Sequence, residues 1–193
     1  MKTLIRSVCV YCGSGMGNDP AFAEAARSFG RIMAKESVRL IYGGGATGLM
    51  GELARSTLNA GGEVTGVIPT FLKAREVDLK ECTELVVVPD MHVRKQTMFD
   101  RADAFVALPG GVGTLEELAE QMTWAQIGRH RKPILIADVK GFWKPLLSLF
   151  AHMREAGFIR PGFEVKPLVA EKIADVLPML RAAAERSSLS ARV

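Results

Sequence analysis

The stretch Ala104-Phe-Val-Ala-Leu-Pro-Gly-Gly-Val-Gly-Thr-Leu-Glu-Glu117 decides the fold of this chain. It opens with a short apolar run, as expected of a strand in a parallel sheet that is covered on both faces. A proline and three glycines then form a turn, and Thr114 begins a segment with the apolar spacing of a helix. This order of strand, glycine-rich turn and helix is the repeating unit of α/β proteins.

The same order recurs along the chain. The sequence predicts strands at Ser7–Tyr11, Val38–Tyr42, Val64–Ile68, Leu85–Val88, Ala104–Leu108 and Ile134–Ala137, with a weaker one near Glu164–Val169. It predicts helices at Pro20–Lys35, Gly48–Asn59, His92–Ala102, Thr114–Ile127, Phe142–Glu155 and Glu171–Arg186. Because crossovers between parallel strands are right-handed, this alternation indicates a doubly wound, Rossmann-like α/β sheet with helices on both faces. The ligand crevice of such a sheet lies beyond the carboxyl ends of its strands.

Length and composition are those of a single folded domain. The 193 residues fit one domain spanning residues 1–193, of which we expect only the tail, residues 182–193, to fray. Apolar residues make up 48% and charged residues 24% of the chain, which excludes a disordered or low-complexity protein. No apolar run is long enough to cross a bilayer, and Met1–Arg6 lacks the apolar core of a signal peptide. We therefore expect a cytoplasmic protein with no membrane partner.

Cysteine, histidine and charge patterns exclude several kinds of site. Three cysteines are an odd number, so we expect reduced thiols, and Cys9-Val-Tyr-Cys12 closes a strand where a redox pair would open a helix. The three histidines show no metal-ligand spacing, so we expect no metal. The net charge of +4 is scattered; it permits a nucleic acid as partner and suits an anionic small molecule equally well. Because no basic stripe interleaved with aromatic residues is present, we expect no nucleic-acid partner.

Glycine-rich turns follow three of the predicted strands. They are Cys12–Gly15, Gly43–Gly48 and Pro109–Thr114, and in a parallel sheet all three open at the same edge. One such turn alone makes only a tight strand-to-helix connection, but three at one edge favour a ligand site. Neither the P-loop nor the dinucleotide fingerprint is present. The amides and the dipole at the start of the helix near Thr114 favour an anion such as phosphate.

Charged side chains lie beside these turns. Glu116 and Glu117 point about 100° apart on a helix, so at most one of them aims fully at the crevice. A carboxylate there could hold or deprotonate a water molecule, although carboxylates also suit a helix start. Arg94 begins another helix at the same edge, where it is either an anion ligand or a surface cation. The charged connector Thr70–Glu84 is expected to be a short helix with loops or a lid.

These residues resemble the signature of the LONELY GUY family. The resemblance rests on the runs Leu108–Glu117 and Met91–Lys95, together with Tyr42–Gly45 and Thr123–Gln126, and covers nearly the whole chain. It implies a phosphoribohydrolase: water cleaves the N-glycosidic bond of a cytokinin riboside 5′-monophosphate to give the free base and ribose 5-phosphate. AMP is a second substrate that the resemblance implies, and no cofactor is expected.

The resemblance also assigns residues. It implies that Arg94 and Glu117 are the catalytic residues. The substrate-binding candidates are Gly13, Ser14, Gly44, Glu76, Lys95, Gly110, Gly111, Val112, Gly113, Thr114, Glu116 and Thr123. Glu76 is placed through a variable segment, and Val112 stands where plant members commonly have tyrosine. Family members pair through helices, so a homodimer is expected, with a hexamer as the alternative.

Other functions remain open at this point. A non-catalytic nucleotide-binding module would need the same glycine turns and differs only in not using the carboxylate. Members of the family are also labelled lysine decarboxylase-like, which implies pyridoxal phosphate. That cofactor needs a lysine that forms a Schiff base, and no lysine of this sequence stands in a convincing cofactor context.

Overall fold

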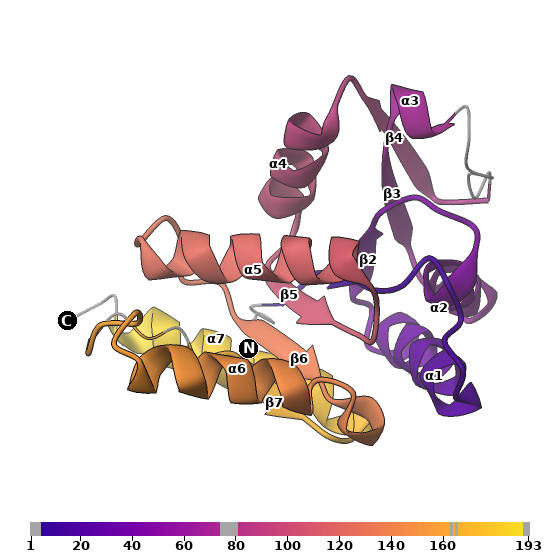
Figure 1. Ribbon diagram of the computed structural model, residues 1–193. Helices are drawn as coiled ribbons and strands as arrows, with labels where there is room; N and C mark the ends of the chain where they lie inside the picture. The colour runs from indigo at the N-terminus through magenta and orange to yellow at the C-terminus, as the bar shows by residue number, and fades with distance from the viewer. Residues whose placement is uncertain (1–4, 74–80, 163, 165, 191–193) are drawn as a thin grey trace.

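The computed structural model describes residues 5–73, 81–162, 164 and 166–190. Seven parallel strands form one sheet in the order β4-β3-β2-β1-β5-β6-β7. The strands are β1 (Ser7–Tyr11), β2 (Arg39–Tyr42), β3 (Val64–Pro69), β4 (Glu84–Val88), β5 (Ala104–Ala107), β6 (Ile134–Ala137) and β7 (Leu168–Ala170). The order runs outward from β1 in one direction and from β5 in the other. The predicted doubly wound α/β fold is therefore confirmed (Figure 1).

Helices cover both faces of the sheet. They are α1 (Pro20–Lys35), α2 (Gly48–Asn59), α3 (Thr70–Lys73), α4 (Met91–Arg101), α5 (Val112–Gln126), α6 (Lys144–Glu155) and α7 (Val176–Ser190), with 3-10 turns η1 (Val139–Gly141) and η2 (Ile173–Asp175). Side chains of α1, α2 and α7 pack in one core cluster, and those of α4, α5 and α6 in a second. None of the described helices is long and apolar enough to span a membrane.

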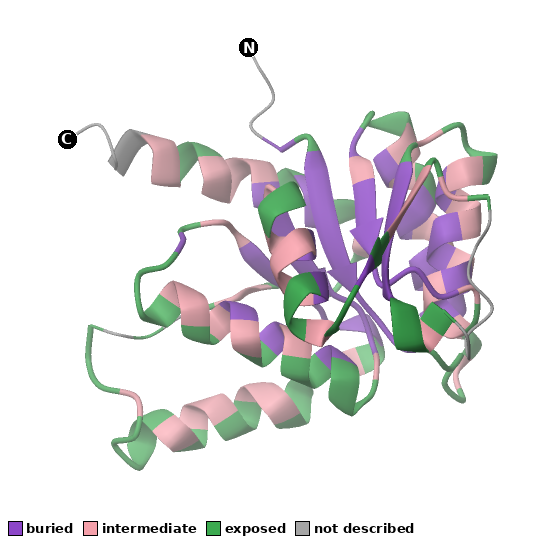
Figure 2. Ribbon diagram, turned by 90° about the horizontal axis from the view of Figure 1, so that it is seen from above, coloured by how far each residue is buried: buried purple, intermediate pink, exposed green. Residues whose placement is uncertain are grey.

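Alternation along the strands explains the two clusters. Val8 and Val10 of β1 belong to the cluster under α1 and α2, whereas Cys9 and Tyr11 belong to the cluster under α4 and α5. Successive side chains of a strand point to opposite faces, and both faces are covered, so every residue of β1 is buried. Figure 2 shows the central strands buried, the edge strand β4 partly exposed, and exposed residues on the outer sides of the helices.

Helix starts follow the capping signals of the sequence. The Asp19 carboxylate accepts a hydrogen bond from the amide of Ala21 at 2.8 Å, and Pro20 occupies the first helical position of α1. Asp90 caps α4 in the same way, accepting from the amide of Val93 at 2.9 Å. The second cap positions Arg94 in the first turn of α4, immediately after β4.

Several predicted boundaries were wrong. The strand predicted near Glu164–Val169 is the three-residue edge strand β7, because only Leu168–Ala170 pairs with β6. The helix predicted from Phe142 begins at Lys144, since the Asp138 carboxylate accepts a bond from the Trp143 amide and holds a turn there. The last helix begins at Val176, after η2, and continues to Ser190. The expected short helix in the connector is α3; residues 74–80, with Glu76, lie outside the described residues.

Candidate functional site

The three glycine turns meet at the carboxyl edge of the sheet, where β1 and β5 lie side by side. The amide of Gly13 donates to the carbonyl of Pro109 at 3.0 Å, which joins the first and third turns. The second turn approaches the first so closely that a Cβ on Gly48 would lie 2.2 Å from the Ser14 carbonyl oxygen. The expectation of one shared edge is confirmed, at the point where the strand order reverses.

A buried ion pair lies at this edge. Nη1 of Arg94 donates to Oε1 of Glu117 at 3.0 Å, and the side chains are only 10% and 12% exposed, respectively. Arg94 comes from α4 and Glu117 from the second turn of α5, so the pair joins two helices on the same face of the sheet. Arg94 is therefore not the surface cation of the alternative interpretation.

The sheet holds the guanidinium group of Arg94 in place. Its Nε donates to the carbonyl of Val67 at 3.1 Å, and its Nη2 donates to the carbonyl of Gly43 at 3.3 Å. A Cβ at position 43 would lie 2.1 Å from Nη2, so only glycine leaves room for the guanidinium group there. Gly43 is thus a residue of this site that the sequence analysis missed. The run Tyr42–Gly45 was the available signal, but it did not distinguish Gly43 from Gly44.

Burial controls the ionisation of the carboxylate. Desolvation raises the pKa of Glu117 above its ordinary value, while the positive charge of Arg94 acts in the opposite direction and the neighbouring Glu116 raises the pKa further. A carboxyl group that is buried, raised in pKa and paired to one cation is typical of functional sites.

A polar cavity of about 290 Å³ opens over this pair. Its lining combines the first and third glycine turns with the pair: Cys12, Gly13, Ser14, Met50, Leu72, Arg94, Gly111, Val112, Gly113, Thr114 and Glu117. Helix α5 begins at Val112, and no side chain caps it. Because the first amides of a helix have no intrahelical acceptor, those of α5 are left for a ligand or water. These amides and the helix dipole favour an anion at this end of the cavity.

Not every predicted site residue lies in this cavity. Lys95 and Glu116 form an ion pair of 2.6 Å between α4 and α5, and Lys95 also binds Glu120 at 2.9 Å. Thr123 lies further along α5, exposed, with its hydroxyl donating to the Ala119 carbonyl. Gly44 has a positive φ of 81° and packs against β3, so it shapes the turn. Gly110 lies directly against the Thr114 side chain. A Cβ added to Gly110 would lie 2.1 Å from the hydroxyl oxygen of Thr114.

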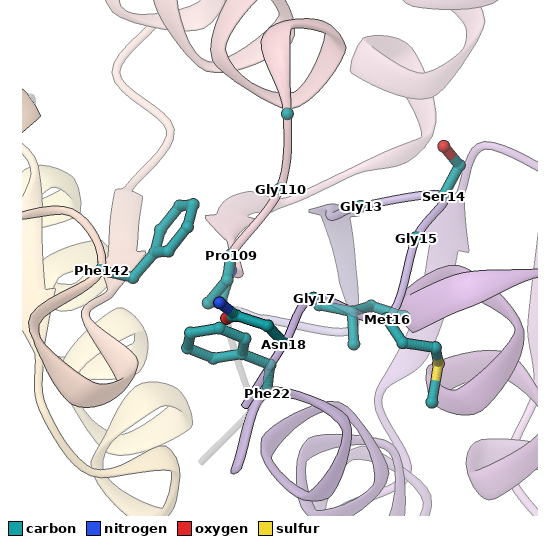
Figure 3. A pocket seen from close by; sticks show the side chains of 12 residues that line it. Gly13, Ser14, Gly15, Met16, Gly17, Asn18, Phe22, Pro109, Gly110 and Phe142 are labelled. Atoms are coloured by element: carbon teal, nitrogen blue, oxygen red, sulfur yellow. The ribbon is translucent and has the colours of Figure 1, made fainter. Parts of the chain in front are cut away.

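A second, apolar cavity of about 420 Å³ adjoins the first (Figure 3). Both cavities are lined by Gly13, Ser14 and Gly111. The remaining walls of the apolar cavity are Gly15, Met16, Gly17, Asn18, Phe22, Leu49, Pro109, Gly110 and Phe142. The sequence analysis missed its side chains, because Phe22 and Phe142 are 120 positions apart and no local pattern links them.

Cys9 and Cys12 are free and buried, and Cys12 lines the polar cavity. Burial raises the pKa of both thiols far above the usual value, which favours the neutral thiol over the thiolate. Among the residues that the structure describes, no three histidine, cysteine or acidic side chains are arranged to hold a metal ion.

Comparison with known proteins identifies the family of this chain. The sequence model of a family described as "Possible lysine decarboxylase" matches residues 50–180. The probable cytokinin riboside 5′-monophosphate phosphoribohydrolase LOG4 of Oryza sativa subsp. japonica is 43% identical over 180 residues, which are 93% of this chain and 78% of the relative. The cytokinin riboside 5′-monophosphate phosphoribohydrolase of Rhodococcoides fascians is 42% identical over 177 residues, 91% of this chain and 89% of the relative. The chain belongs to the LONELY GUY family.

Solved structures share the fold of this LONELY GUY protein. A molybdenum cofactor carrier protein from Chlamydomonas reinhardtii superposes with a TM-score of 0.69 at 20% identity, covering 94% of this chain and 99% of the other. The molybdenum cofactor binding protein of Rippkaea orientalis gives 0.68 at 20% identity, covering 92% and 96%. At this identity the likeness shows the fold alone.

The family's description as a possible lysine decarboxylase implies pyridoxal phosphate, and the lining of the polar cavity shows whether that cofactor fits. Pyridoxal phosphate needs a lysine for its Schiff base, and the described residues that line the polar cavity of this LONELY GUY protein include none. The one nearby candidate from α4, Lys95, is held by Glu116 and Glu120. The described lining does not fit that cofactor.

Proposed function

We propose that this protein hydrolyses the N-glycosidic bond of cytokinin riboside 5′-monophosphates, and of AMP, to the free base and ribose 5-phosphate. The observation that carries the proposal is the buried Arg94–Glu117 pair at a cavity that also contains the free amides at the start of α5. Relatives more than 40% identical over most of the chain are named for this activity. A non-catalytic binding module would not need a buried carboxylate.

The reaction places specific demands on the site. The bond between C1′ of the ribose and the base nitrogen breaks, and its electron pair leaves with the base. Positive charge then develops on the sugar, and the oxygen of a water molecule forms the new bond to C1′. The ionised Glu117 stabilises that charge and orients the water, while the proton that water releases is taken up by the departing base.

Arg94 and the first amides of α5 contact other parts of the substrate in this proposal. Three N–H groups of Arg94 are engaged by Val67, Gly43 and Glu117, so its first role is to position the carboxylate. Arg94 lines the polar cavity, and a guanidinium group has five N–H donors, so two remain for the substrate in this proposal. The amides at the start of α5, around Gly113 and Thr114, bind the 5′-phosphate.

The proposal includes a homodimer. Helix α5 carries an exposed stripe, which we name the α5 stripe: Val112, Leu115, Ala119, Thr123 and Ile127. Its members recur every three or four residues and therefore lie on one side of the helix. A second copy of the chain that packs on the α5 stripe would remove this apolar surface from water.

Four substrates test the activity. The purified protein is incubated with N6-isopentenyladenosine 5′-monophosphate, with AMP, and with the two corresponding nucleosides, and free base and ribose 5-phosphate are measured by chromatography. Base released from the monophosphates but not from the nucleosides is the expected result. Nucleotide binding without base release would support the binding module instead.

A further inference from the structure

A groove between α1 and α2 has no part in the proposed reaction. These helices lie side by side and pack on the face of the sheet opposite α4 and α5 (Figure 1). The groove, which we name the α1–α2 groove, contains a cavity of about 370 Å³, within the range of small-molecule sites. It is lined by Arg27, Arg31, Glu52, Arg55, Ser56, Asn59 and Ala60. Since three of these residues are cations and one is an anion, the lining favours a negatively charged ligand.

The arginines of the α1–α2 groove are oriented by carboxylates and still have donors to spare. Arg27 donates to Glu24 at 3.2 Å and also to Glu52. Arg31 donates to Glu24 at 2.6 Å. Arg55 donates to Glu52 at 3.1 Å and to a backbone carbonyl. A guanidinium group has five N–H donors, and no more than two on any of these arginines have an acceptor among the described residues. The arginine side chains are 38% to 52% exposed, so a dissolved anion can reach them.

A phosphate group matches this arrangement of cations. Arg27 and Arg31 lie one helical turn apart on α1, and Glu52 bridges Arg27 to Arg55 on α2. Guanidinium groups bind phosphate oxygens in pairs, and a tetrahedral phosphate can accept from more than one arginine at once. The ion pairs that hold these side chains are partly exposed, and such pairs contribute little to stability. A phosphate can therefore take up donors in the groove without breaking a contact on which the fold depends.

Arg55 connects the α1–α2 groove to the site at the edge of the sheet. Its Nη1 donates to the carbonyl of Ala46 at 2.8 Å, and Ala46 belongs to the second glycine turn. The first residue of that turn, Gly43, accepts the bond of 3.3 Å from Arg94. The contact is closely packed, because a Cβ on Gly51 would lie 2.1 Å from the Ala46 oxygen and 2.8 Å from Nη2 of Arg55. A ligand that moves Arg55 therefore changes the support of the second glycine turn.

We propose that the α1–α2 groove is a second anion site, which binds a phosphate group, and that Arg55 transmits its occupation to the second glycine turn. A phosphate that accepts from Arg55 competes with the Ala46 carbonyl for this arginine. The turn then has two arrangements, and the phosphate stabilises the one in which Arg55 is released. The inference does not depend on hydrolysis, because the described linings of the groove and of the polar cavity have no residue in common.

Arginine side-chain NMR tests the site directly. The Nε–H signals of the three groove arginines are assigned by their loss in Arg27→Lys, Arg31→Lys and Arg55→Lys, and inorganic phosphate is titrated into the wild type. Sodium chloride at the same ionic strength is the reference. The three signals should follow saturation curves with one common Kd, whereas the signal of Arg186, exposed on α7, should not. Equal responses to phosphate and chloride, or an equal response of Arg186, would overturn the site.

A matched pair of variants tests which cations hold the phosphate. Arg31→Gln removes one cation of the groove and leaves the second glycine turn untouched, since Arg31 is bonded to Glu24 on its own helix. The Kd read from the Arg55 signal should rise about tenfold. Arg186→Gln removes the same charge from an exposed position of α7 and should leave the Kd unchanged. An unchanged Kd in Arg31→Gln would also overturn the assignment.

The backbone amide of Thr47 reports the coupling, because it belongs to the same peptide group as the Ala46 carbonyl. Its signal should shift with the Kd of the groove arginines, and Arg31→Gln should move this shift to about tenfold higher phosphate concentration. Phosphate at the start of α5 would instead shift the Gly113 amide, and Arg31→Gln should not affect that shift. Failure of the proposed phosphate site is thus visible separately, at Gly113. A Thr47 signal that stays in place while the groove saturates would overturn the coupling.

Discussion

Glu117 is a buried acid whose ionisation is opposed by its surroundings. Desolvation raises its pKa, the Arg94 charge lowers it and the Glu116 charge raises it. If the carboxylate is the active form, kcat/KM rises as pH rises through the pKa of Glu117. The acid limb of the profile then lies above the ordinary range of a glutamate.

Glu116 should influence the pH at which the acid limb of the kcat/KM profile lies. Glu116→Gln removes a negative charge that raises the pKa of Glu117, so the limb should move to lower pH. Glu185→Gln, an exposed position on α7, is the control and should leave the limb in place. The measurement is kcat/KM across acidic and neutral pH. A limb that stays in place in Glu116→Gln would show that another group titrates.

Gly43 is predicted to be essential for the placement of Arg94. In Gly43→Ala the new methyl group would occupy the position of Nη2, 2.1 Å away, and displace the guanidinium group from the carbonyl at position 43 and from Glu117. Misplacement of about 1 Å in a catalytic group costs about a hundredfold in rate. We expect kcat to fall by this factor with a smaller change in KM, in steady-state kinetics. Wild-type kcat in a folded Gly43→Ala protein would contradict this role.

The sequence predicted part of this site and not the rest. The family resemblance pointed to Arg94 and Glu117, which both line the polar cavity, whereas the residue pattern alone left open whether Glu116 or Glu117 faces the crevice. The contacts of Arg94 with Gly43 and Val67 were not predicted, because they join residues 51 and 27 positions apart. Phe22 and Phe142 were missed for the same reason. Pairing across a sheet edge depends on strand order, which local spacing does not encode.

Helices α4 and α5 are joined by Lys95 as well as by the Arg94–Glu117 pair. Burial opposes the charge of Lys95, but hydrogen bonds to Glu116 and Glu120 together keep the pKa of this lysine above its usual value. Oε2 of Glu120 is buried without a hydrogen-bond partner among the described residues. Loss of the lysine would leave that carboxylate with less compensation for its burial.

We therefore predict that Lys95→Met destabilises the protein. The free energy of unfolding should fall by about 1–3 kcal/mol, measured by chemical denaturation. Lys172→Met, at an exposed position with no ion pair among the described residues, should change it by less than about 0.5 kcal/mol. The KM for AMP should stay close to the wild-type value, since Lys95 lies outside the described lining of the polar cavity. Full stability with a large rise in KM would instead assign Lys95 to substrate binding.

Element boundaries were predicted best where a capping residue or a strict apolar run defines them. Ser7–Tyr11, Pro20–Lys35, Gly48–Asn59 and Ile134–Ala137 were predicted without error. The C-terminal third was predicted less well. There, the start of α6 depends on the hydrogen bond from the Trp143 amide to the Asp138 carboxylate, and β7 is an edge strand that pairs only with β6. Both features depend on contacts that the local sequence pattern does not show.

At the scale of the whole molecule, the apolar α5 stripe predicts association of two chains. Ala119→Arg places a charge in the middle of this stripe on an exposed side of α5. We expect the wild type to be a dimer of 20.9 kDa chains and the variant to be a monomer, by size-exclusion chromatography with light scattering. Arg186→Ala, at an exposed position of α7, is the control. A variant that remains dimeric would place the interface elsewhere.

The most direct test of the account is the rate of base release by Glu117→Gln. The amide keeps the shape of the side chain but cannot carry the negative charge, so kcat with N6-isopentenyladenosine 5′-monophosphate should fall by about 10²–10⁴-fold. The Kd of the nucleotide should change little, because the proposed phosphate site is formed by the amides at the start of α5 and not by Glu117. Turnover close to the wild-type rate in this variant would contradict the assignment of Glu117 as the catalytic carboxylate.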